Sequence, residues 1–174
     1  MDVHFALSDL ASLDQLKTEA LCLPFFRDER PLRGAPGLVD FRLCGRVSEQ
    51  LVKDRMRGDF GEVVLMPARP RLMVERLLWV GAGMRADMDE ARFRSWIADV
   101  MARLVALRVR TGALVLPGRV LDRVDAALGM QWFLEASAAL ADHVDELTIL
   151  DTAEAHRSMQ PVVERARRRA LADM

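Results

Sequence analysis

The sequence predicts an α/β fold in which a central sheet lies between two layers of helices. Short apolar runs of four to seven residues alternate along the chain with longer amphipathic segments. The short runs are apolar at consecutive positions, which is typical of strands covered on both faces. Regular alternation of the two kinds of segment favours a sheet enclosed by helices. Strands are expected at Val3–Leu7, Ala20–Phe26, Glu62–Pro67, Arg76–Val80, Ala113–Leu116 and Glu146–Leu150.

Four helices are expected between and after these strands. The clearest is the segment 89–109, where apolar residues recur at three- and four-residue spacing and acidic residues crowd the start. The last helix is expected to begin after Asp151, whose side chain would cap it while Glu154 reaches back. The helices are expected at Leu38–Met56, Asp89–Val109, Met130–Asp142 and from Asp151 toward Met174.

Length and composition indicate one soluble domain. The chain has 174 residues, 51% hydrophobic and 29% charged, without repeats or an evident linker. A formal net charge of -1 gives no bulk attraction for nucleic acid or an anionic membrane. The start of the chain lacks the pattern of a signal peptide, and no apolar run reaches the ~18 residues of a membrane helix. We expect a cytoplasmic protein with no membrane or nucleic-acid partner.

The cysteines and histidines do not have the spacing of a metal site. Cys22 and Cys44 are both expected to be buried free thiols, with a disulfide between them as the alternative. His4 is expected in the core or at a sheet edge, and His143 and His156 at the surface. Without a His-Glu-x-x-His or Cys-x-x-Cys pattern, we expect no metal and no cofactor.

Three segments together carry a resemblance to a known family. In order and spacing they resemble the N-terminal domain of the leucyl aminopeptidase family, over roughly residues 1 to 155 of the single domain 1–174. Residues 152–174 are expected to form a C-terminal helix. The segments are Phe25–Asp40 with Leu43–Arg46, Gly58–Glu62, and Arg76–Gly83.

The resemblance implies a three-layer α/β/α sandwich, similar to macro domains, with a mixed sheet of about six strands. In the family this domain precedes a separate catalytic domain and contributes to packing in a hexamer. The family's catalytic half contains the run Asn-Thr-Asp-Ala-Glu-Gly-Arg, and this sequence contains no Asn. No catalytic or metal-binding residue of the family can therefore be assigned to a position here, and we expect no enzymatic activity.

A search independent of the resemblance finds no catalytic pattern either. No serine lies in a Gly-x-Ser-x-Gly elbow. The acidic pairs Asp28/Glu29 and Asp87/Asp89 are expected to be solvated or to cap helices. The run Gly81–Ala86 matches a relaxed dinucleotide fingerprint, but the next helix starts near Asp89, so a strand-ending turn is the favoured interpretation.

The loop before the first long helix is the one candidate binding site. Backbone N–H groups at a helix start, with an arginine beside them, can hold an anion. The alternative interpretation is a tight turn with a helix cap, because Pro36 lacks an N–H. The candidate residues are Arg33, Gly34, Ala35 and Gly37.

The sequence thus predicts a stand-alone, non-catalytic interaction domain that self-associates or binds a catalytic aminopeptidase subunit encoded elsewhere. The alternative is a macro-domain-like module that binds a small molecule of nucleotide or ADP-ribose type. The basic run Arg165–Arg169 is interpreted as a solvated helix end, with a docking helix as the second interpretation. The apolar residues Met130, Trp132, Phe133 and Leu134 are expected in the core, or at a partner surface where exposed.

Overall fold

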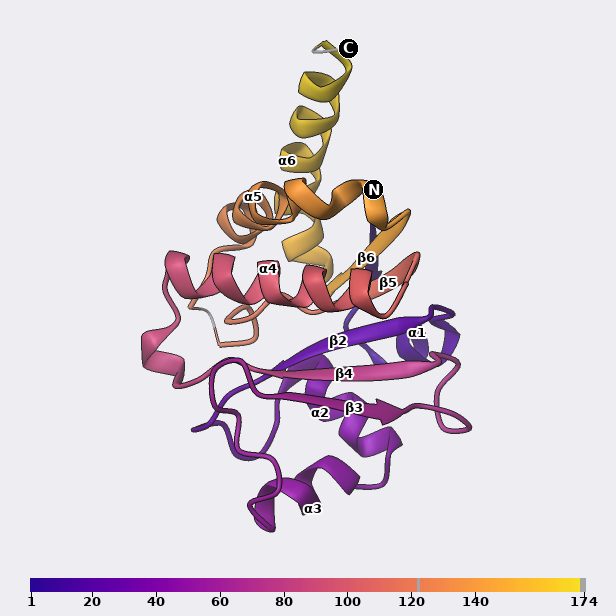
Figure 1. The fold of residues 1–174 in the computed structure, drawn as a ribbon, viewed down its shortest axis with the longest axis vertical. Coiled ribbons are helices and arrows are strands. Elements are labelled where there is room, and N and C mark those ends of the chain that lie inside the picture. Colours follow the sequence, from indigo (N-terminus) through magenta and orange to yellow (C-terminus); the bar gives the residue numbers. More distant parts are fainter. Residues whose placement is uncertain (122, 173–174) are drawn as a thin grey trace.

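A six-stranded mixed sheet forms the centre of the molecule (Figure 1). The structure, a computed structural model, describes residues 1–121 and 123–172. The strand order is β1-β6-β5-β2-β4-β3, with β3 antiparallel to β4 and the other neighbours parallel. All six predicted strands are confirmed, although β5 begins and ends two residues earlier than expected. The strands are β1 (Asp2–Leu7), β2 (Ala20–Phe25), β3 (Val63–Pro67), β4 (Arg76–Gly81), β5 (Thr111–Leu114) and β6 (Glu146–Asp151).

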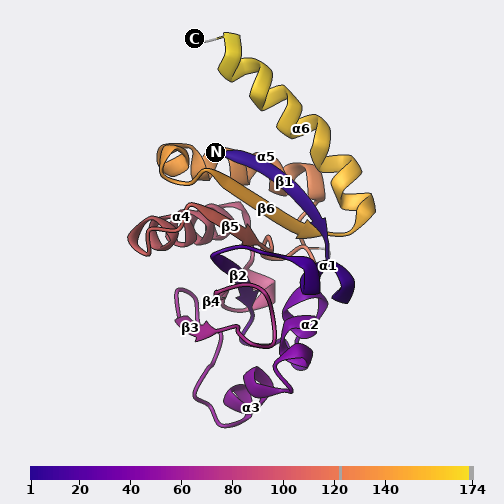
Figure 2. The ribbon, with the colours of Figure 1, turned by 90° about the vertical axis from the view of Figure 1, so that its right-hand side faces the viewer.

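Helices cover both faces of the sheet, which confirms the three-layer sandwich (Figures 1 and 2). One core cluster lies between the sheet and the helices α4, α5 and the first half of α6. The other cluster lies between the opposite face and α1, α2 and α3. The helices are α1 (Leu10–Gln15), α2 (Gly34–Arg42), α3 (Arg46–Val52), α4 (Glu90–Ala106), α5 (Ala126–Ser137) and α6 (Ala153–Ala172), with short 3-10 helices at Arg85–Asp87 and Ala138–His143.

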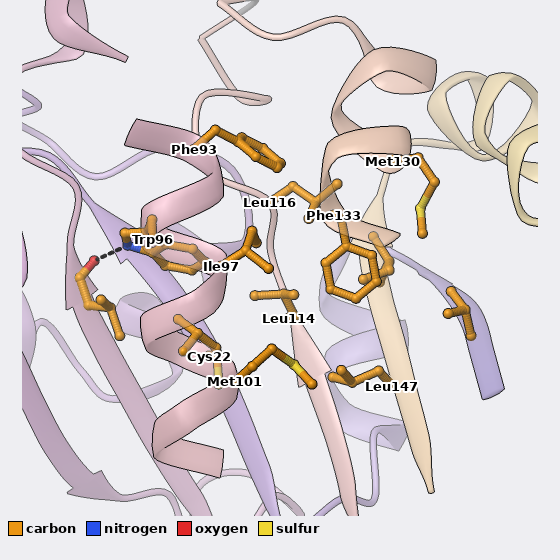
Figure 3. Close-up of a cluster of buried hydrophobic side chains, with 14 of the residues drawn as sticks. Cys22, Phe93, Trp96, Ile97, Met101, Leu114, Leu116, Met130, Phe133 and Leu147 are labelled. Carbon is orange, nitrogen blue, oxygen red and sulfur yellow. Dashed lines mark hydrogen bonds between the residues drawn. The ribbon is translucent and has the colours of Figure 1, made fainter. Parts of the chain in front are cut away.

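Helix α4 has the amphipathic pattern that the sequence predicts. Its apolar stripe is buried along the whole helix, and the Asp89 side chain caps the start by accepting the Arg92 backbone N–H at 2.9 Å. Trp96 is 1% exposed, and its Nε1 donates to the Val80 carbonyl at 3.3 Å (Figure 3). Cys22 lies in the same cluster, where burial raises the pKa of its thiol to about 12.

The single helix expected over Leu38–Met56 is wrong, because the chain forms two helices there. Between α2 and α3, Cys44 and Gly45 adopt positive φ angles of 57° and 75°, and the reversed backbone ends α2. Asp40, 6% exposed, accepts the Val47 N–H at 2.7 Å and so caps α3 from the preceding helix. The turn also exposes Cys44, which corrects the expectation that it is buried; both cysteines are free thiols, as expected.

The starts of the last two helices also differ from expectation. Helix α5 begins at Ala126 rather than Met130, because Asp125 caps it by accepting the Leu128 N–H at 3.0 Å. At α6 the cap is Thr152, whose Oγ1 accepts the Ala155 N–H at 3.2 Å. Asp151 instead pairs with an arginine, as described below.

The structure contains one helix, α1, that the sequence does not predict; Asp9 caps it. The predicted apolar group near residue 130 is confirmed in part. Of the predicted apolar group, Met130 and Phe133 are fully buried, whereas Trp132 and Leu134 are half-buried against the same core. No helix within residues 1–121 and 123–172 is long and apolar enough to cross a membrane.

Candidate functional site

The chain reverses the direction of its connections at the carboxyl ends of β2 and β5. These two strands are parallel neighbours in the sheet. The chain leaving β2 enters α2 on one face, whereas the chain leaving β5 enters α5 on the opposite face. In open α/β sheets such a switch point opens a crevice outside the carboxyl ends of the strands, where ligands commonly bind.

Gly34 and Val120 lie in close contact at this switch point. Gly34 has a φ of +58°, and a Cβ added to it would lie 2.6 Å from a Val120 methyl group. The close approach therefore requires glycine both for its backbone and for its lack of a side chain. Val120 lines a hollow on either side of this contact.

The larger hollow, of about 500 Å³, lies at the carboxyl ends of β1, β5 and β6 and is mainly acidic. Asp125, Asp151 and Glu154 line it, with Arg119 as the only arginine among its lining residues. Arg119 Nε lies 2.9 Å from Asp151 Oδ2, with the two side chains 13% and 10% exposed. Arg119 also donates to the Val124 carbonyl, so the pair fastens the loop after β5 to the start of α6.

The smaller hollow, of about 380 Å³, lies at the carboxyl ends of β2 and β4 and is mainly basic. We call it the arginine hollow, because Arg33, Arg85 and Arg123 line it together with one carboxylate, Asp28. Asp28 accepts the backbone N–H of Arg85 at 2.9 Å and its Nε at 3.0 Å. Partial burial acts to raise the pKa of Asp28, but these two hydrogen bonds outweigh it and lower the pKa.

Glu29 lies beside this hollow in an unfavourable environment. It is 5% exposed, and no described residue forms a hydrogen bond with its Oε1. Burial raises the pKa of the Glu29 carboxyl, although Arg85 and Arg33 oppose the shift. The expectation that both carboxylates are solvated or helix-capping is therefore wrong for Glu29, which is buried. Asp28 does accept the first backbone N–H of the 3-10 helix that begins at Arg85, and it also pairs with the Arg85 side chain.

The predicted anion-binding loop is divided by the fold rather than gathered at one point. Arg33 is the N-cap of α2 and lines the arginine hollow, whereas Gly34 lines the acidic hollow. Ala35 is fully buried, and Gly37 packs so close to the Leu32 carbonyl that an added Cβ would lie 2.5 Å from its oxygen. The sequence gives no sign that residues 33, 85 and 123 meet, so it does not predict that Arg85 and Arg123 line a hollow together with Arg33.

The other predicted features have structural roles. Gly81 packs against the Asp59 backbone and Gly83 has a φ of +76°, which agrees with a strand-ending turn. His4 lies exposed on the edge strand β1, and His143 is also exposed. Within the described ranges, no group of three or more His, Cys, Asp or Glu residues could hold a metal ion.

His156 corrects the expectation of a surface position. Its ring is half-buried and lies 4.9 Å from the Phe5 ring, centroid to centroid. No hydrogen-bond partner is found for its buried Nε2 among the described residues. Burial lowers the pKa of His156, although the Asp151 carboxylate opposes the shift.

A third surface feature is the second half of α6, which extends beyond the body of the molecule (Figures 1 and 2). Met159, Val162 and Val163 are buried, but from Glu164 to Ala170 every residue except the half-buried Ala166 is exposed. Arg167 reaches back to β1, where it donates to the Val3 carbonyl at 3.2 Å. The exposed segment begins where the apolar stripe of the helix ends.

A groove of about 470 Å³ runs between this half of α6 and α5. Apolar groups line it from Leu134 of α5, from Ala138 at the start of the following 3-10 helix, and from Val162 and Ala166 of α6. The charged residues that line the groove are Glu135, Arg165 and Arg169. We call it the α5–α6 groove.

Comparison with solved structures defines the class of fold. The chain superposes on a Trypanosoma brucei macrodomain in complex with ADP-ribose with a TM-score of 0.73 and 11% identity, covering 92% of this chain and 68% of that chain. It superposes on a tomato leucine aminopeptidase mutant with a TM-score of 0.63 and 14% identity, covering 93% of this chain and 35% of that chain. The fold is macrodomain-like, as expected.

Sequence comparison identifies the family within this class. Residues 22–146 match the N-terminal domain of the cytosol aminopeptidase family, and the chain belongs to that family. It is 28% identical to a probable cytosol aminopeptidase of Bordetella pertussis over 82% of this chain and 28% of that protein. It is also 28% identical to a cytosol aminopeptidase of Pseudomonas aeruginosa over 72% of this chain and 25% of that protein. The chain thus spans about a quarter of the length of these relatives.

Proposed function

We propose that this domain is a non-catalytic interaction domain that binds a catalytic aminopeptidase chain through the second half of α6 and the α5–α6 groove. The observation that carries the proposal is the abrupt change along α6 from buried to exposed. The helix has 20 residues and is therefore about 30 Å long. Helices in proteins gain most of their stability from packing, so the exposed half is a surface suited to a partner.

The chemistry of the groove indicates what the partner presents. Its apolar floor would accept an aliphatic or aromatic side chain, as helix grooves do in helix-mediated recognition. Arg165 and Arg169 at its edge would pair with carboxylates, and arginine is well suited to such interface pairs. The partner surface is therefore an apolar anchor flanked by acidic residues.

The test is co-purification with the catalytic chain of a cytosol aminopeptidase from the same cell, followed by size-exclusion chromatography with light scattering. We expect a stoichiometric complex. Ala166→Trp fills the groove and should weaken binding by about tenfold or more, which corresponds to about 1.4 kcal/mol. Ala153→Trp, at the exposed start of the same helix, is the matched control and should bind as the unmodified domain does.

Three results would contradict this proposal. If the domain remains monomeric in the presence of the catalytic chain, the catalytic chain is not its partner. If the domain only self-associates, the partner is a second copy of this domain. Equal loss of binding in both tryptophan variants would exclude the groove as the contact. The non-catalytic role is tested with leucine p-nitroanilide and Mn²⁺, where we expect no hydrolysis above background.

A second candidate function is the binding of a small molecule of nucleotide or ADP-ribose type in the crevice at the switch point. It is supported by the two hollows on either side of Gly34 and by the likeness to a macrodomain described in complex with ADP-ribose. The loop residues Arg33, Gly34, Ala35 and Gly37 stay candidates for contact with such a ligand. A ligand that binds the folded state raises the unfolding midpoint, so a thermal-shift screen with ADP-ribose tests this candidate, and no shift at millimolar ligand would remove it.

A further inference from the structure

We propose that the arginine hollow is an anion site that takes a phosphate group, with Arg33, Arg85 and Arg123 as its ligands. This proposal rests on the second candidate function, because both place a ligand in the crevice at the switch point. The new elements are the hollow that binds the ligand, the three arginines that contact it and the phosphate group that they recognise. The proposal does not depend on the docking role of α6.

The first argument is the charge balance of the hollow. Among its lining residues three arginines face one aspartate, in a molecule whose formal net charge is -1. Both carboxylate oxygens of Asp28 are already engaged by Arg85. Among the described residues Arg33 and Arg123 form no ion pair, although the buried Glu29 carboxyl lies close enough to Arg33 to interact with its charge. Their guanidinium groups are therefore open to a ligand, and guanidinium groups match the geometry of phosphate oxygens.

The second argument is that fixed elements bring the three arginines together. Arg85 begins the 3-10 helix after β4, and Asp28 holds both its backbone and its side chain. Arg33 is the N-cap residue of α2. The backbone N–H of Arg123 donates to the Gly118 carbonyl at 3.0 Å, which ties its position to the loop after β5. Anchored backbones lower the entropy lost when a ligand is bound.

The third argument is a comparison with the other hollows of the molecule. The acidic hollow carries Asp125, Asp151 and Glu154 and would repel a phosphate. Another hollow, of about 320 Å³, is lined by Arg46, Arg69 and Arg71 together with Glu49, but it lies beside Pro67 at the end of β3. Because β3 runs antiparallel to β4, that hollow lies away from the switch point. Of the three hollows compared, only the arginine hollow is both mainly basic and located at the switch point.

The experiment measures the affinity for inorganic phosphate and for pyrophosphate by isothermal titration calorimetry at low chloride. The double variant Arg33→Gln/Arg123→Gln removes two exposed arginines of the hollow. It should lower the affinity for both anions by about tenfold or more, because each arginine removed takes away a charge-assisted hydrogen bond to the anion. The control Arg46→Gln/Arg71→Gln removes the same charge from the other arginine-lined hollow and should change the affinity by less than about twofold, as expected for groups that do not touch the ligand.

Each outcome decides the proposal. Loss confined to Arg33→Gln/Arg123→Gln supports it. Equal loss in both double variants means that bulk charge attracts the anion, and loss confined to the control places the site elsewhere; either result overturns the proposal. No heat of binding for either anion in the unmodified domain also overturns it. Adenosine, titrated in parallel, separates this failure from that of the second candidate function, because an uncharged nucleoside can bind the crevice without the arginines.

Discussion

Helices α4 and α6 begin alike and end differently. Both have side-chain caps and an apolar stripe that packs on the same core cluster. The stripe of α4 continues from Phe93 to Leu104, and the whole helix lies on the sheet. The stripe of α6 stops at Val163, whereas the helix continues to Ala172 (Figure 2). A helix of this chain can therefore extend beyond the hydrophobic core that its first turns contact. The half of α6 that does not pack on the core is the half that we propose binds a partner.

The largest expected effect is a loss of stability when a buried side chain of α4 is removed. Trp96→Ala removes a fully buried indole of α4 and its hydrogen bond to Val80, and should lower the free energy of unfolding by about 3–5 kcal/mol. Trp132→Ala is the matched control, since Trp132 is only half-buried, 5.5 Å from the Phe93 ring between centroids. Urea unfolding measures both. A similar decrease in the free energy of unfolding in the two variants would contradict the conclusion that the buried stripe of α4 contributes more to stability than a half-buried side chain.

The next effect tests how the start of α6 is anchored. Arg119→Met leaves the carboxylate of Asp151, just before α6, without its ion-pair partner. The free energy of unfolding should fall by about 2–3 kcal/mol. This is less than for a fully buried pair, because both side chains are slightly exposed. Arg27→Met breaks the exposed pair with Asp59 and should cost less than about 1 kcal/mol. Thermal unfolding compares the two variants. If Arg119→Met unfolds like Arg27→Met, the buried pair does not anchor α6.

A smaller effect compares the two helices directly. Ala98 in α4 and Ala170 in α6 are both exposed, so the change to glycine acts through the backbone in each case. Ala98→Gly should lower the free energy of global unfolding by about 1 kcal/mol. Ala170→Gly should have almost no effect, because the end of α6 unfolds locally without the core. Equal costs in urea unfolding would show that the exposed half of α6 folds together with the core.

The smallest effect concerns pH. The pKa of His156 is lowered in the folded state, mainly by burial, so protonation favours the unfolded chain. Stability should therefore fall as the pH drops below the ordinary histidine value of about 6.5. His156→Phe retains the contact with the Phe5 ring and removes the titrating group, so this part of the loss between pH 7 and 5 should disappear. An unchanged pH profile would contradict this assignment.

The sequence predicts the strands better than the site for a physical reason. Each strand is a local apolar run, and all six are found. The break between α2 and α3 depends on positive φ at Cys44, a residue type that rarely adopts it, and at Gly45. A single glycine inside a helical pattern is an ambiguous signal, because a continuous helix tolerates it at a small cost. The arginine hollow depends on residues 33, 85 and 123 meeting in space. Of these the sequence singled out only Arg33, because it precedes a glycine-rich helix start.

The same distinction applies to α6. The sequence indicates a basic helix end at Arg165–Arg169, and in the structure every residue of this segment except the half-buried Ala166 is exposed. The groove beside it combines α5 and α6, so it could not be identified from either helix alone. A solvated end and a docking helix have the same sequence pattern, and the apolar groove is the feature that favours docking.

The most direct test of the docking role is hydrogen exchange of α6, measured with and without the catalytic aminopeptidase chain. In the domain alone, amides 164–170 should exchange rapidly while those of α4 stay protected, because only α4 is packed along its whole length. With the catalytic chain present, we expect amides 164–170 to become protected, together with those of α5 that border the groove. Unchanged rapid exchange at 164–170 in a mixture containing the catalytic chain would contradict the proposal that this half of α6 is its binding surface.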